Sequence, residues 1–190
     1  LALIPCLLSL ASLGPALSMS PEPQPNAMDV YPPSLSGSFP VPLDSFSYTD
    51  EACETFPLRY LAHTSFAAAS PPASSPTPVF LYLGNEGPIE SFYNASGGIF
   101  ELAESLSAAV VFIEHRYYGE SLPFGDDDSF TPSNLQYLTI EQALADYSLF
   151  ISSLPSLLPP SDYLPPVIWG GSYGGMLAAW HRMKYPHLTL

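Results

Sequence analysis

The sequence is poor in basic residues. Four Lys and Arg side chains stand against 18 Asp and Glu side chains in 190 residues, which gives a formal net charge of -14. Such a chain repels phosphate backbones and offers no basic patch, so we exclude nucleic acid as a partner. An acidic compartment would relieve the self-repulsion by protonating carboxylates. The charge balance therefore suits an endolysosomal or vacuolar setting.

The chain also lacks an initiator methionine and has only two cysteines. Its start at Leu1 is followed by an apolar run of secretory-signal length, and we expect residues 1–18 to be a signal peptide. A short membrane anchor or a buried helix is the alternative, but the span is short and contains two prolines, which argues against a stable membrane anchor. Removal of the signal would take Cys6 away and leave Cys53, whose partner we expect outside this chain.

Residues 19–43 lack periodicity and are rich in Pro and Ser, so we interpret them as an exposed, disordered leader that needs no fold. The chain as a whole is 47% hydrophobic and long enough for one domain with a core. We place that domain at residues 44–190. It starts with residues 56–63, whose alternating pattern predicts a hairpin region at a sheet edge.

Short continuous apolar runs predict strands that are covered on both faces, at residues 79–83, 109–113 and 167–169. Helical patterns lie between and after these runs, at residues 97–106, 139–154 and 176–185. Alternating strands and helices indicate the α/β class, with a mostly parallel sheet and helices on both faces. In such a sheet, ligands meet the carboxyl ends of the strands.

The helix over residues 139–154 carries its own boundary signals. Thr139 is the predicted N-cap, and Gln142 three residues later completes a capping box. Pro155, Pro159 and Pro160 are expected to end the helix.

One strand is joined to a helix by the sequence Gly170-Gly171-Ser172-Tyr173-Gly174, a Gly-x-Ser-x-Gly turn. A serine on so sharp a turn is strained and lifted clear of the sheet, so Ser172 is the candidate nucleophile. The Tyr173 amide at the helix start can donate to a developing oxyanion. A glycine-rich turn in a binding fold is the alternative.

A second polar turn follows the strand at residues 79–83. Asn85 and Glu86 lie where a hydrolase with this turn supplies its second oxyanion amide, so both are oxyanion or substrate-binding candidates. The strand should neighbour the nucleophile strand, about 5 Å away. The alternative is that both residues only shape a tight turn.

The third strand end carries residues 114–121, which could line a pocket roughly 10 Å from Ser172. We favour a structural role, a buried ion-pair network in which Glu114 or Glu120 fixes Arg116.

No histidine is well placed as the general base. His181 follows Ser172 on the same helix, about 13 Å along its axis and beyond hydrogen-bond reach, and His187 is further still. His63 lies on an early edge segment, and His115 is the one internal histidine near the right face. Because the usual order is Ser, then Asp or Glu, then His, we expect both partners to lie beyond the end of this chain.

Two further motifs carry weaker predictions. Consecutive carboxylates at residues 126–128 lack the spacing of a calcium loop and predict a solvated turn, and no metal or cofactor is called for. Asn94-Ala95-Ser96 fits an N-glycosylation acceptor, which predicts an exposed loop at Asn94.

Residues 44–190 resemble the lysosomal Pro-Xaa carboxypeptidase and dipeptidyl peptidase II family of serine peptidases, and look closer to the carboxypeptidase. The matching blocks are residues 55–61, 84–87, 114–125, 138–146, 170–180 and 183–187.

The resemblance implies an α/β-hydrolase fold, of which this chain is the N-terminal part, and cleavage of peptides next to proline in a lysosome, in a vacuole or outside the cell. Ser172 matches the family nucleophile. The family's Asp, His and helical cap have no counterpart here, so this chain alone should be inactive. A homodimer of the full-length protein is left open.

Two other functions are compatible with these residues. An esterase or lipase could use the same fold and turn, since neither names the leaving group. A non-catalytic fragment or binding protein is the second, and an in-frame stop codon after Leu190 would favour it.

Overall fold

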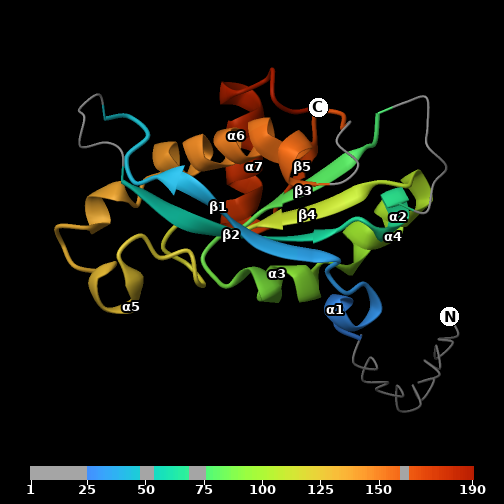
Figure 1. Ribbon diagram of the computed structural model, residues 1–190, viewed down its shortest axis with the longest axis horizontal. Coiled ribbons are helices and arrows are strands. Elements are labelled where there is room, and N and C mark those ends of the chain that lie inside the picture. The colour runs from blue at the N-terminus through green and yellow to red at the C-terminus, as the bar shows by residue number, and fades with distance from the viewer. Residues whose placement is uncertain (1–24, 48–53, 69–75, 159–162) are drawn as a thin grey trace, which may run out of the picture.

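The structure is a computed structural model that describes residues 25–47, 54–68, 76–158 and 163–190. The predicted signal peptide and both cysteines lie outside these residues. In chain order the elements are α1 (Ala27–Val30), β1 (Leu35–Pro42), β2 (Thr55–His63), α2 (Ser65–Ala68), β3 (Val79–Leu83), α3 (Ile89–Ala95), α4 (Gly97–Leu106), β4 (Ala109–Ile113), α5 (Gly125–Asp128), the 3-10 helix η2 (Leu135–Tyr137), α6 (Ile140–Leu157), β5 (Val167–Trp169) and α7 (Ser172–Lys184) (Figure 1).

The strands form one sheet in the order β1-β2-β4-β3-β5. β3 pairs in parallel with β4 and with β5, and Leu81 lies opposite Val111 on one side and Ile168 on the other. β1 and β2 form an antiparallel hairpin, and β2 pairs antiparallel with β4. The parallel part and the hairpin at its edge are therefore both present as predicted.

Helices cover both faces of the sheet. One core cluster packs alternate strand residues, such as Leu81 and Val111, against α6 and α7. The other packs Phe80 and Phe112 against α3 and α4. In Figure 1, α6 and α7 lie above the sheet and α1, α3 and α4 below it. Strands buried on both faces need no polar alternation, which is why β4 is an unbroken apolar run.

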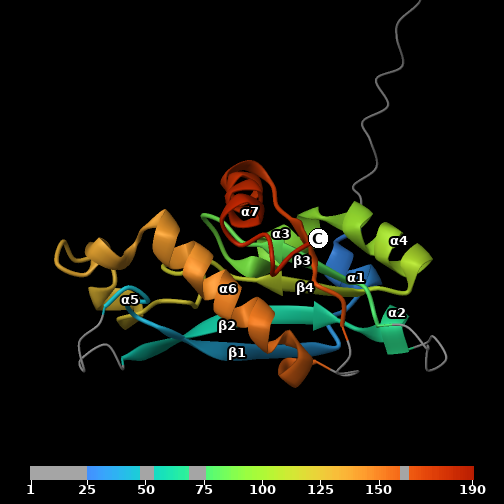
Figure 2. The ribbon, with the colours of Figure 1, turned by 90° about the horizontal axis from the view of Figure 1, so that it is seen from above.

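The chain reverses its direction across the sheet at β3. It moves from β3 outward to β4, then crosses back over β3 to form β5. Both crossovers have the same handedness but run in opposite directions across the sheet, so their helices lie on opposite faces. α3 and α4 cover one face and α6 covers the other (Figure 2). The carboxyl ends of β3 and β5 meet at this switch point, where open α/β sheets bind ligands.

The predicted leader at residues 19–43 is wrong in its described part, because β1 lies within it and pairs along the whole length of β2. Its residues alternate after all: Leu35, Phe39 and Val41 turn inward while the serines and Pro40 are exposed. The prediction relied on the high Pro and Ser content, but an edge strand tolerates proline and small residues.

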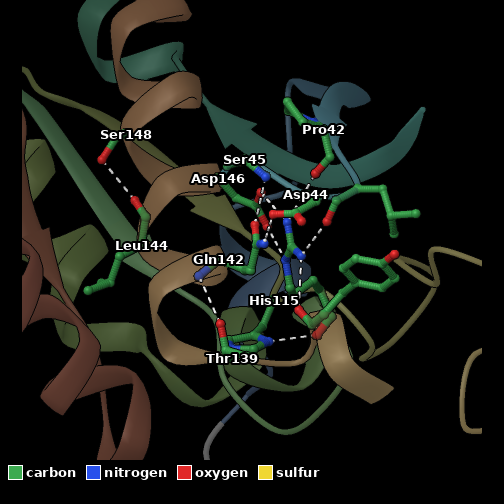
Figure 3. A network of polar contacts seen from close by, with 12 residues as sticks. Pro42, Asp44, Ser45, His115, Thr139, Gln142, Leu144, Asp146 and Ser148 are labelled. Carbon is green, nitrogen blue, oxygen red and sulfur yellow. Dashed lines mark hydrogen bonds and ion pairs between the residues drawn. The ribbon is translucent and has the colours of Figure 1, made fainter. Parts of the chain in front are cut away.

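α6 begins as predicted, since the Thr139 hydroxyl accepts the Gln142 backbone N–H. The second half of the capping box is absent, because the Gln142 side chain bonds instead to Asp44 and to the backbone N–H of Ser45 after β1 (Figure 3). The helix ends before Pro159 and Pro160, as predicted, whereas Pro155 does not end it. Pro155 sits within the last turn, and the helix runs on to Leu157.

Within the described ranges, no helix is long and apolar enough to cross a membrane. The candidate site is the set of polar side chains that follow β3, β4 and β5, at the carboxyl ends of the parallel strands.

Candidate active site

Ser172 occupies a strained turn between β5 and α7. Its φ is +51°, in the left-handed region that a residue other than glycine enters at a cost, and its side chain is exposed. The turn is too tight for larger neighbours. A Cβ added to Gly170 would lie 2.3 Å from the Gly174 carbonyl oxygen, and one added to Gly174 would lie 2.7 Å from the Leu83 carbonyl oxygen. The sharp strand-to-helix turn predicted from the glycine pattern is thus present.

The first turn of α7 leaves backbone amides free at the same place. The first intrahelical bond runs from the Gly175 N–H to the Gly171 carbonyl, so the Tyr173 amide precedes the helical ladder. The partial positive charge of a helix N-terminus favours an anion there. His181, Arg182 and Lys184 in the last turn complement the opposite end of the dipole. The geometry can stabilise negative charge beside the Ser172 hydroxyl.

Asn85 lies beside the turn at residues 170–174, which we call the elbow, but its side chain is already hydrogen-bonded. The residue is buried, and its Nδ2 donates to the Gly171 carbonyl at 2.9 Å. This bond joins the turn after β3 to the residue that precedes Ser172, as neighbouring strands β3 and β5 allow. The Asn85 side chain therefore braces the elbow, which leaves its backbone amide as the group that could reach an oxyanion.

Glu86 is exposed at the mouth of the same turn. The charge of its carboxylate contributes to raising the pKa values of groups around Ser172. The pKa of Tyr173 is raised to about 12, mainly by burial and to a smaller extent by Tyr118 and Glu86. Burial also raises the pKa of Tyr118, with a second contribution from Glu86. Glu86 thus adds a negative charge beside Tyr118 and Tyr173, at what we call the rim of the site.

His115 is buried and bonds to protein groups on both sides of its ring. Nδ1 lies 2.6 Å from the Arg116 carbonyl oxygen, and Nε2 lies 3.2 Å from the Tyr173 hydroxyl. Burial lowers its pKa to about 4, and the Arg116 charge adds to this, while the backbone bond and Glu86 oppose it. The ring is therefore neutral, and it contacts Tyr173, the residue after Ser172, rather than Ser172 itself.

None of the chain's four histidines hydrogen-bonds to the Ser172 hydroxyl, and all four are described. His63 Nδ1 bonds to the Pro32 carbonyl at 2.8 Å. His181 Nε2 lies 3.1 Å from the Ser148 hydroxyl, and burial lowers its pKa to about 4. The His187 ring lies 6.5 Å from the Tyr185 ring, tilted against it, after the helix has ended. The elbow is present without a general base among these residues.

The cluster after β4 is a buried ion-pair network, but with a different partner from the predicted one. The Arg116 guanidinium binds both carboxylate oxygens of Asp146 at 2.7 Å and donates to the Pro42, Leu43 and Tyr137 carbonyls (Figure 3). The prediction of Glu114 or Glu120 as its partner is wrong. In a continuing strand Glu114 and Arg116 would share a face, but β4 ends at Ile113 and the chain turns at residues 115–118. Arg116 therefore meets Asp146 on α6, while Glu114 meets the first amide of α3.

Glu114 is enclosed by donors near α3. Its carboxylate accepts from the Ile89, Glu120 and Ser121 amides and from the Ser121 hydroxyl, at 2.7 to 3.0 Å. A Cβ on Gly119, whose φ is +59°, would lie 1.9 Å from its Oε1. The loop folds around this carboxylate, so residues 114–121 serve as structure and carry His115 to the elbow.

The remaining predicted positions differ in outcome. Asp126–Asp128 are exposed in the short helix α5, and the described residues contain no group of acidic, His or Cys side chains that could hold a metal ion. Asn94 lies in helix α3 and not in the exposed loop that was predicted. Its Oδ1 accepts the Met28 N–H at 3.1 Å, because α1 packs against this helix.

Comparison with known proteins places this geometry among serine peptidases. A family model described as "Serine carboxypeptidase S28" matches residues 41–190. The mouse lysosomal Pro-X carboxypeptidase is 43% identical over 185 residues, which cover 95% of this chain and 35% of that protein. The human lysosomal Pro-X carboxypeptidase is 52% identical over 112 residues, 59% of this chain and 23% of that protein.

A mouse thymus-specific serine protease is 37% identical over 148 residues, 78% of this chain and 27% of that protein. The chain thus spans about a third or less of the length of these relatives. Among solved structures, an S-formylglutathione hydrolase from Agrobacterium tumefaciens aligns with a TM-score of 0.52 at 17% identity, covering 81% of this chain and 55% of that one. This likeness supports the α/β-hydrolase fold alone.

Proposed function

The chain belongs to the serine carboxypeptidase S28 family, and from this we propose that the full-length protein is a serine exopeptidase that cleaves peptides next to proline. The observation that carries the proposal is Ser172, held exposed at a φ of +51° on the turn into α7. A strained residue persists only where its surroundings hold it, and such residues cluster at active sites.

The reaction is acyl transfer. The Ser172 hydroxyl attacks the carbonyl of a prolyl residue while a general base from outside these residues takes its proton. The Tyr173 amide and the Asn85 backbone amide hold the oxyanion. The base then returns the proton to the leaving amine, and water releases the acyl group. A rigid proline ring suits a substrate of this class because little conformational entropy is lost on binding.

The rim adds two further proposals. Glu86 binds substrate, since its exposed carboxylate lies among Tyr118, Tyr173 and His115. Asn94 remains a candidate glycosylation site, and its position at the end of α3 requires the sugar to leave the helix surface. Because relatives are named lysosomal, we also propose that the full-length protein enters the secretory pathway through a signal peptide at residues 1–18, with the lysosome as its destination.

Labelling and substrate panels test the function in the full-length protein. A fluorophosphonate should label the wild type and not Ser172→Ala, while Ser156→Ala, at an exposed serine on α6, should label normally. A blocked peptide that ends in Pro-Xaa tests carboxypeptidase action, and an unblocked Xaa-Pro amide tests dipeptidyl peptidase action. Turnover of short acyl esters without either peptide would replace the proposal by an esterase, and no labelling at all by a non-catalytic protein.

A further inference from the structure

We propose that His115 is a positioning residue of the Ser172 site, which acts through its hydrogen bond to the Tyr173 hydroxyl and so fixes the residue whose backbone amide faces the oxyanion. The inference rests on the proposed function. The contacts of His115 support neither a general base nor a member of the ion-pair network.

The two bonds of the His115 ring determine which nitrogen carries the proton. The Arg116 carbonyl oxygen can only accept, so Nδ1–H donates to it at 2.6 Å. In the neutral ring Nε2 is then an acceptor, and the Tyr173 hydroxyl donates to it at 3.2 Å. With a pKa lowered to about 4 by burial, this tautomer persists through the mildly acidic range.

The ring has little freedom to leave this position. It is buried, with ring centroids 5.3 Å from Tyr118, 6.3 Å from Tyr147 and 5.5 Å from Tyr173. The Tyr147 hydroxyl in turn donates to the Gly84 carbonyl at the end of β3. His115 is thus fixed to the sheet, while Tyr173 belongs to the helix that starts at the elbow.

Two side-chain bonds flank the strained residue. Before Ser172, the Gly171 carbonyl accepts from Asn85 at 2.9 Å, and after it the Tyr173 hydroxyl bonds to His115. Both partners, Asn85 and His115, come from loops that directly follow sheet strands, β3 and β4. Because a left-handed serine relaxes unless it is held on both sides, the second tether keeps the Tyr173 amide at the place where charge develops.

The test compares variants of the full-length enzyme at pH 6, with active sites counted by phosphonate titration. Tyr173→Phe removes only the hydroxyl, while His115→Leu removes its acceptor together with the Nδ1–H bond to the Arg116 carbonyl. We expect each to lower kcat roughly three- to tenfold with KM little changed, since a hydrogen bond of this kind contributes on the order of 1 kcal/mol. The double variant should lose no more than either single variant. His115→Gln, which keeps an acceptor, should recover most of the activity.

His181→Gln is the matched control, because His181 is a buried histidine of the same helix that bonds to Ser148 instead. It should leave kcat unchanged. Additive losses in the double variant, or an unchanged kcat in Tyr173→Phe, would overturn the positioning role while the wild type stays active. A wild type that neither labels nor cleaves prolyl peptides would instead defeat the proposed function. Side-chain nitrogen NMR should separately show His115 protonated on Nδ1.

Discussion

The elbow at Ser172 and the charged cluster at Arg116 both follow the carboxyl ends of parallel strands, yet they are built in opposite ways. The elbow is exposed, strained and held by close backbone packing and two neutral hydrogen bonds. The cluster is buried, and every charge in it meets its complement. Tyr117 beside Arg116 also has a positive φ of +69°, but it is buried. Polar residues at a strand end therefore do not mark a catalytic site by themselves. Strain combined with exposure is the feature that separates the two.

Arg116→Met should give the largest change and should affect stability alone. It leaves the Asp146 carboxylate buried without its partner, which costs about 3–5 kcal/mol of unfolding free energy. Chemical denaturation of the full-length protein measures this loss, and kcat per titrated active site should stay at the wild-type value. Arg59→Met, at a partly exposed ion pair, is the control and should cost far less. A fall in kcat with unchanged stability would erase the distinction between the two regions.

Gly170→Ala should do the reverse and damage activity more than stability. The new Cβ would meet the Gly174 carbonyl at 2.3 Å and the Gly175 nitrogen at 2.7 Å, both backbone atoms, so the first turn of α7 must move. A displacement of about 1 Å at a catalytic group costs on the order of 100-fold in rate. Steady-state kinetics should show this loss, whereas Gly97→Ala, with no atom within 4 Å of the new Cβ, should match the wild type.

The pH dependence of stability gives a smaller contrast, through His181. Its folded pKa of about 4 lies below the ordinary 6.5, so the unfolded chain binds a proton that the folded chain does not. The stability it contributes is complete above about pH 6.5 and is lost as the pH falls toward 4. Asp146 acts in the opposite direction, because burial raises its pKa to about 6 against the Arg116 charge.

His181→Gln should therefore reduce the loss of stability between pH 6.5 and 4.5 by about 1–2 kcal/mol. Urea midpoints of the full-length protein at both pH values measure it, with His187→Gln on the exposed segment after α7 as the comparison. An equal response in both variants would show that burial does not set the titration of His181.

The sequence predicted the parts of this molecule that depend on local patterns. Apolar runs gave β3, β4 and β5, and the spacing of Gly170 and Gly174 predicted the turn that carries Ser172. It failed where partners are distant in the chain. Asp146 lies 30 residues from Arg116 in the sequence. β1 could not be predicted from its own residues, because it is a strand only through its pairing with β2. The bond between His115 and Tyr173 spans 58 residues and leaves no periodic signal.

Glu120→Gln should produce the smallest effect and shows why burial, rather than charge, distinguishes the cluster. Its side chain is 75% exposed, and its carboxylate lies 3.2 Å from Arg59, which keeps Glu90 at 2.6 Å. An exposed pair of this kind contributes less than about 0.5 kcal/mol, and salt screens it further. Denaturation with and without added salt should give wild-type values for this variant. If Glu120→Gln lowered the unfolding free energy nearly as much as Arg116→Met, the difference in burial could not explain the equal losses. The loop around Glu114 would then depend on its surface charges.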